Sequence, residues 1–278
     1  LTGIFSFTLI ARYLGLKTFG EYVLIVTISA FFVPFTDFGM LRITTRDVVT
    51  NKDDSDKYAS SAFFIKTILS VFILFVFFIS IFYFNLKYAF IYAILMSIIS
   101  QSFISFALIY KGLIRTHEKM EYELIFSLIQ QAIFLLCIII VITRNCGFLY
   151  LFFSRLLADI SYLVLFFKKA KKFGFSLSLC KFKRNSIWFL FKESLPLGVY
   201  TLLLTALFKI DIFILGLIRG STEVSLFEVS NRIIMQLPLL AVSILVSLSP
   251  SFSQMAKDSM ETLRSYYEKT FKFLFILS

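Results

Sequence analysis

Residues 122–143 read YELIFSLIQQAIFLLCIIIVIT, and this stretch decides the fold class of the protein. Its only charged residue, Glu123, lies next to the start. A helix of about 20 mostly apolar residues, at a rise of about 1.5 Å each, spans the hydrocarbon core of a bilayer. Strands of a membrane barrel would instead alternate over segments of about 10 residues. The stretch therefore predicts a membrane-spanning helix.

Similar apolar runs recur along the whole chain of 278 residues. Hydrophobic residues make up 59% of it and charged residues 16%, whereas soluble domains carry about 25% charged residues. The sequence thus predicts an all-α, polytopic membrane protein. Both ends lie inside apolar runs, so we expect a fragment of a longer chain with a truncated first helix. The other helices are expected at about 1–15, 22–39, 59–84, 88–110, 148–167, 195–218 and 226–250, with a ninth beginning near 270.

The net charge of +11 comes from lysines and arginines that gather in alternate connections between these runs. Short loops rich in Lys and Arg stay in the cytoplasm, so the alternation predicts a membrane orientation with a cytoplasmic N-terminus, and no nucleic-acid binding. The intervening turns hold one basic residue each, namely Lys17, Lys87, Arg144 and Arg219. The basic connections hold Arg42, Arg46, Lys52 and Lys57, then Lys111, Arg115 and Lys119, then eight residues within 168–192, and finally Lys257, Arg264 and Lys269.

The basic connection 168–192 also marks the expected domain boundary. It would separate an N-terminal lobe of six helices, residues 1–167, from the start of a second lobe, residues 193–278. Aromatic residues interleave with its charges, so we expect part of it to lie in the membrane interface, in contact with anionic lipids.

Motifs of soluble enzymes do not fit the sequence. Gly15 and Gly20 have the spacing of a phosphate-binding loop but lack its lysine, and the cysteines have no metal-ligand spacing. Asp54 and Asp56 lie in a polar cluster before a helix, where capping is the expected role. His117 is the only histidine. We expect no enzyme activity, no cofactor and no metal.

Charged residues inside the apolar runs are the functional candidates, because each costs about 2.5 kcal/mol or more at the bilayer centre. Two pairs spaced four apart are expected to neutralise themselves within a helix: Arg155 with Asp159, and Glu228 with Arg232.

The remaining charges inside the apolar runs lie either near a helix end or deep within one helix. Arg12 and Lys66 lie near predicted helix ends, and we expect them to extend to the headgroups. Asp37 is expected to cap the turn after its helix. Lys209 and Asp211, two residues apart, point to different faces of one helix. We expect at least one of them to meet a partner from another helix or a water-filled cavity.

Five segments of the chain form a recognisable set. They are Arg12-Tyr-Leu-Gly15 with Phe19-Gly20-Glu-Tyr22, Asp37-Phe-Gly39 with Arg46-Asp47, Lys192-Glu-Ser-Leu-Pro196-Leu-Gly198, Asp211-Ile-Phe-Ile-Leu-Gly216, and Leu248-Ser-Pro250-Ser-Phe252-Ser. In their order and spacing, these segments resemble the Wzx-type flippases, the polysaccharide-transporter branch of the MOP superfamily. One departure is Ser225-Leu-Phe227, where that family usually has Gly-x-Tyr after the seventh helix.

The resemblance implies a two-lobed transporter of the bacterial inner membrane. Its substrate would be an undecaprenyl-diphosphate-linked oligosaccharide, flipped by alternating access for surface polysaccharides such as the O-antigen of lipopolysaccharide. By the same resemblance, Arg12, Asp37, Lys209 and Asp211 are candidate cavity residues. Arg12 and Lys209 would contact phosphate, while Asp211 would tune the lysine or take part in coupling to H+ or Na+.

Three alternatives remain open at this stage. A cation-coupled drug or metabolite exporter of the same superfamily would depend on acidic residues. A membrane polysaccharide polymerase or glycosyltransferase usually carries a large loop, whereas the turns here are short. A scaffold without transport activity would leave Lys209 and Asp211 without a cavity.

Overall fold

The computed structural model describes residues 2–41, 43, 55–83, 87–115, 119, 121–173, 184–235, 266 and 270–272. The chain divides into two compact units, Leu1–Val224 and Ser225–Ser278. The predicted helix at 226–250 is described only up to residue 235, and most of the predicted ninth helix lies outside the described residues.

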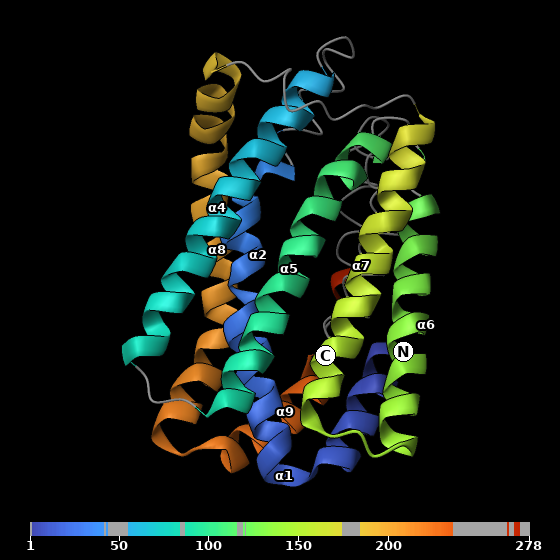
Figure 1. Cartoon of the computed structure of the whole chain (residues 1–278), viewed down its shortest axis with the longest axis vertical. Helices are drawn as coiled ribbons and strands as arrows, with labels where there is room; N and C mark the ends of the chain where they lie inside the picture. The colour runs from blue at the N-terminus through green and yellow to red at the C-terminus, as the bar shows by residue number, and fades with distance from the viewer. Residues whose placement is uncertain are drawn as a thin grey trace. The chain divides into compact units, whose positions relative to one another are not determined.

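The described residues form helices and no strand. Counting α1 and α2 together, six helical stretches are long and apolar enough to cross a membrane, which confirms an all-α polytopic membrane protein. The helices, drawn in Figure 1, are α1 (Thr2–Ala30), α2 (Phe32–Asp37), α4 (Ser55–Tyr83), α5 (Tyr88–Arg115), α6 (Glu121–Thr143), α7 (Phe148–Lys172), α8 (Arg184–Ile218) and α9 (Ser221–Ile234).

Two breaks divide the first helical stretch. Gly15 has φ 71° and ψ 169°, a conformation that glycine adopts without steric cost, and the chain changes direction within α1 (Figure 1). The predicted end of the first helix near residue 15 is therefore confirmed, although the helix resumes at once instead of after a loop. The second break separates α1 from α2, because Pro34 has no N–H to donate to the carbonyl of Ala30.

Within the first unit, α5 packs against α1, α2, α4 and α7, while α7 also packs against α6 and α8 packs against α1, α2 and α4. Small side chains such as Ala93, Ala107 and Ala158, each 0% exposed, allow these helices to approach closely. Large apolar side chains elsewhere are exposed, as Phe72 and Phe75 of α4 are, and lipid is the solvent that suits them.

The helix ends that flank two of the basic connections lie at one end of this unit. The C-terminal ends of α5 and α7 and the N-terminal ends of α6 and α8 all lie toward the top of Figure 1, whereas the α6–α7 and α8–α9 turns lie toward the bottom. Which end faces the cytoplasm stays a prediction. Helix α7 runs to Lys172 and α8 begins at Arg184, so both extend beyond their predicted ends into the basic connection. Lysine and arginine are good helix formers, so charged flanks can prolong a helix past the hydrocarbon.

Candidate functional site

One face of α8 is directed toward α1 and α2. At 100° per residue, six of its residues fall within an arc of about 80°. A Cβ built on Gly198 would lie 2.6 Å from the ring of Phe38, and one on Gly216 would overlap the side chain of Leu24. Since Phe38 follows α2 and Leu24 belongs to α1, contacts at both ends fix the direction of this face. The six residues, called the α8 stripe below, are Gly198, Thr201, Thr205, Lys209, Ile212 and Gly216.

Lys209 lies within the α8 stripe and is half-buried, one turn before Ile212, which is 0% exposed. Asp211 is exposed, and a separation of two residues turns it about 200° away from Lys209. This confirms that the two charges occupy different faces of the helix. Within the described part of the chain, neither side chain forms an ion pair or a hydrogen bond.

Arg12 lies on the first segment of α1 and is exposed. It too has no ion pair among the residues that the structure describes. A buried cluster joins its helix to α8, because Ile10, 2% exposed, and Ile212 belong to the same apolar cluster. The structure thus brings the helices of Arg12 and Lys209 into contact.

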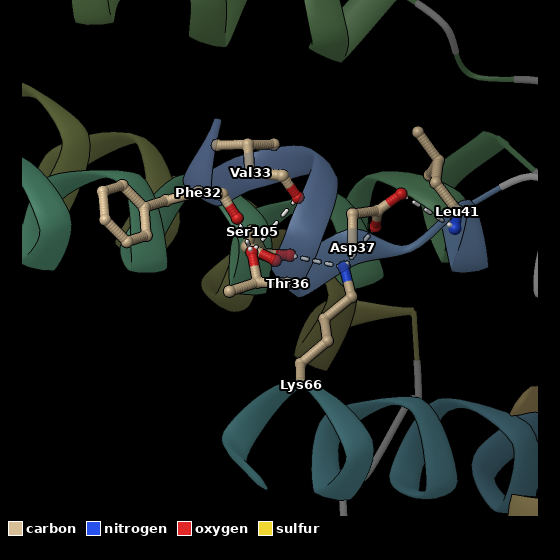
Figure 2. A network of polar contacts seen from close by, with 7 residues as sticks. All are labelled: Phe32, Val33, Thr36, Asp37, Leu41, Lys66 and Ser105. Atoms are coloured by element: carbon tan, nitrogen blue, oxygen red, sulfur yellow. Dashed lines mark hydrogen bonds and ion pairs between the residues drawn. The ribbon is translucent and has the colours of Figure 1, made fainter. Parts of the chain in front are cut away.

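Asp37 has a different environment, shown in Figure 2. Its Oδ1 lies 2.6 Å from Nζ of Lys66, which also donates to the carbonyl oxygen of Ser105 at 2.7 Å. The backbone N–H of Leu41 donates to Oδ2 at 3.5 Å, so Asp37 does cap the turn after α2. These contacts tie together α2, α4 and α5.

The prediction that Lys66 reaches the headgroups is wrong. Its side chain is 1% exposed, and that of Asp37 is 13% exposed. A carboxylate and a carbonyl oxygen lie within reach of its ammonium group, and together they compensate for the loss of water. Sequence spacing gave no signal of this pairing, because 29 residues separate the partners.

A second buried network surrounds Asp159 of α7, which is 0% exposed. Its Oδ2 accepts hydrogen bonds from Oγ of Ser100 and, at 3.2 Å, from Nε of Arg155. Its Oδ1 accepts one from Nε2 of Gln130 at 2.6 Å. The predicted pairing of Arg155 with Asp159 is confirmed, and the carboxylate also joins α5 and α6 to α7.

In the second unit, Nη1 of Arg232 lies 3.5 Å from Oε1 of Glu228, as the spacing of four residues predicted. Glu228 is 5% exposed. The pair is long for a charged hydrogen bond, so it is weaker than the pair of Asp37 with Lys66.

Tyr13 is a structural residue that the sequence did not single out. Its hydroxyl donates to Oδ1 of Asn145 at 3.0 Å and accepts from the N–H of Gly147 at 3.1 Å. These bonds fasten the first segment of α1 to the α6–α7 turn. The one feature of the sequence that could have drawn attention to Tyr13 is its position in the Arg12-Tyr-Leu-Gly15 segment.

Two of the segments that carry the family resemblance lie against each other; Arg46-Asp47 and residues 248–253 lie outside the described residues. Gly39 has φ +78°, and a Cβ built on it would lie 2.6 Å from Cβ of Leu197. The segment from Asp37 to Gly39 therefore lies against the segment from Pro196 to Gly198. Among the described residues, no group of histidine, cysteine and carboxylate side chains is arranged to hold a metal ion.

These segments agree with a comparison against protein families. The family described as "Polysaccharide biosynthesis protein" matches residues 1–256. The chain belongs to this family. Wzx-type flippases are members of this family, so the resemblance is confirmed. At the level of the family, the role of the chain is polysaccharide transport. No curated protein and no solved structure matches the chain.

Proposed function

We propose that the protein flips an undecaprenyl-diphosphate-linked oligosaccharide across the bacterial inner membrane by alternating access, for surface-polysaccharide synthesis. The task is to move a charged, hydrated headgroup through about 30 Å of hydrocarbon. Cations sheltered between helices would pair with the diphosphate, while the prenyl tail stays in lipid. No covalent bond is made or broken, so the protein is not an enzyme by this account.

The observation that carries the proposal is Lys209, a half-buried cation without an ion pair among the described residues. An ammonium group inside a membrane helix needs an anion or water. Lys209 lies on the face of α8 that is directed toward α1 and α2, with Thr201 and Thr205 along the same stripe. A phosphate would satisfy it through charge-assisted hydrogen bonds.

The other candidates take distinct roles in this proposal. Arg12 supplies a second cation from α1, whose Ile10 shares an apolar cluster with Ile212 of α8. Asp211, exposed and without an ion pair among the described residues, is the candidate for coupling to H+ or Na+. Asp37 acts indirectly, because its carboxylate is already held by Lys66 and positions the end of α2 beside α8.

A cellular experiment tests the proposal. The full-length protein, with Lys209→Ala or Asp211→Ala, would be expressed in a strain lacking its own flippase. Lys87→Ala is the matched control, because Lys87 is an exposed lysine beside a helix end. We expect surface polysaccharide to fall and the lipid-linked intermediate to accumulate in the Lys209 and Asp211 variants alone. Normal export by both variants, at wild-type protein levels, would refute the site.

The exporter alternative predicts another pattern. If the chain extruded cationic compounds, replacing Asp211 would abolish drug resistance and replacing Lys209 would not. Measuring growth in the presence of cationic dyes, in the same strains, separates the two functions.

A further inference from the structure

Arg155 occupies the inward face of α7. The exposed large apolar side chains of this helix fall within an arc of about 100° and form its lipid-facing side; they are Tyr150, Phe153, Leu157, Val164 and Phe167. Arg155 lies about 170° from the middle of that arc.

The residues on either side of Arg155 on the inward face are buried. Leu151 and Ala158 are 0% exposed, and Tyr162 is 7% exposed. The side chain of Arg155 is nevertheless 34% exposed. This partly accessible side chain therefore starts from the face of α7 that is opposite the lipid-facing side chains.

The guanidinium group of Arg155 is only partly satisfied. Its Nε donates to Oδ2 of Asp159 at 3.2 Å, and its Cζ lies 5.3 Å from the ring centre of Phe134. Within the described residues its terminal nitrogens, Nη1 and Nη2, donate no hydrogen bond. Unmet donors on a charged group are costly in apolar surroundings, so these nitrogens need an acceptor.

The side chain of Arg155 does not extend to the lipid headgroups, as arginines in membrane helices often do. Arg155 lies seven residues after Phe148, which is about 10 Å along α7. A long basic side chain near a helix end ordinarily extends outward to the headgroups. Arg155 instead reaches Asp159, one turn deeper, where Ser100 and Gln130 hold the carboxylate in place.

A planar guanidinium fork with free terminal nitrogens matches the oxygens of a phosphate group. Leu151, one turn before Arg155, belongs to the same apolar cluster as Ile10 of α1 and Ile212 of α8. We infer that Arg155 is an additional anion-binding residue, held by Asp159, that contacts the diphosphate of the lipid-linked substrate. This inference rests on the proposed function.

Binding measurements on the purified full-length protein test it, with farnesyl diphosphate as the probe and nanodiscs of phosphatidylcholine. Arg155→Gln alone would leave Asp159 as an unpaired buried charge and so risks misfolding. The decisive variant is the double substitution Arg155→Gln/Asp159→Asn, which replaces both charged side chains with neutral amides. The matched control is Arg144→Gln, since Arg144 is exposed beyond the end of α6.

We expect the double variant to bind the probe about tenfold or more weakly than wild type, because a charge-assisted hydrogen bond contributes roughly that factor. The Arg144 variant should bind normally. Equal affinity of the double variant and wild type would overturn the role of Arg155, while a loss in Lys209→Ala would still support the proposed function. Failure of the wild-type protein to bind the probe would count against both.

A bilayer lipid could supply the same chemistry, so a second set of nanodiscs contains phosphatidylglycerol. If this lipid is the true occupant, it should compete with the probe in wild type but not in the double variant. That result would assign Arg155 to a bilayer lipid and overturn the substrate contact. Absence of competition supports the diphosphate.

Discussion

The ring of Phe38 lies so close to Gly198 that a Cβ built on this glycine would be 2.6 Å from two ring carbons. The same ring stacks on Phe191 with centroids 5.8 Å apart, which limits how far it can move. Gly198 begins the α8 stripe, so this contact sets the separation of α8 from the end of α2. The position of Lys209 relative to α1 and α2 depends on it.

Replacing Gly198 with alanine should therefore destabilise the protein. Overpacking of this kind costs about 1–3 kcal/mol, and we expect a lower thermal unfolding temperature in detergent. Gly3→Ala is the control, since a Cβ there meets nothing within 4 Å. Adding Phe38→Leu to the Gly198 variant should restore part of the loss, and equal stability of Gly198→Ala and wild type would contradict the close contact.

The buried pair of Asp37 and Lys66 gives a second prediction. Lys66→Met should cost about 3–5 kcal/mol of unfolding free energy, because it leaves the carboxylate of Asp37 uncompensated. Adding Asp37→Asn to Lys66→Met should recover much of that loss. A double-mutant cycle by thermal or denaturant unfolding measures the coupling. Additive effects of the two substitutions would show that the pair does not form.

Substitutions in the network around Asp159 should lower the stability of the protein by different amounts. Asp159→Ala leaves Ser100 and Gln130 without their acceptor and Arg155 without its counter-charge, so we expect a loss of about 3–5 kcal/mol. Ser100→Ala removes one hydrogen bond and should cost about 0.5–1.5 kcal/mol. Comparing the two unfolding temperatures checks the order, and a larger loss for the serine variant would contradict it.

Tyr13 offers a local test. Tyr13→Phe removes the hydroxyl that accepts from the N–H of Gly147, so hydrogen exchange at that amide should become faster. The stability lost should be small, about 1 kcal/mol. Unchanged exchange in the α6–α7 turn would show that the hydroxyl does not protect this amide.

The sequence predicted the helices because each must supply enough apolar residues to cross the bilayer. It also predicted the break near Gly15 and the local pair of Arg155 with Asp159, since both depend on neighbours along the chain. It missed the bonds of Lys66 with Asp37, Ser100 with Asp159, and Tyr13 with Asn145. Those contacts depend on how each helix is rotated about its axis, and a helix that is apolar on every side carries little signal of that rotation.

For the candidate site, the sequence predicted the positions of the charges along α8 but not the helices that they face. Hydropathy marked Lys209 and Asp211 as charges deep in a helix, and their spacing correctly placed them on different faces. Only the contacts of Gly198 with Phe38 and of Gly216 with Leu24 show which face is directed toward α1 and α2. Glycine spacing alone could not identify the partner helices.

The most direct test of the central claim is flipping of a fluorescent undecaprenyl-diphosphate-linked oligosaccharide in proteoliposomes that contain the full-length protein. We predict that Lys209→Ala lowers the initial rate at least about tenfold, because the diphosphate loses a charge-assisted hydrogen bond inside the membrane. Lys209→Arg should retain a substantial part of the rate, and Lys87→Ala all of it. Transport by Lys209→Ala at the wild-type rate would contradict the account.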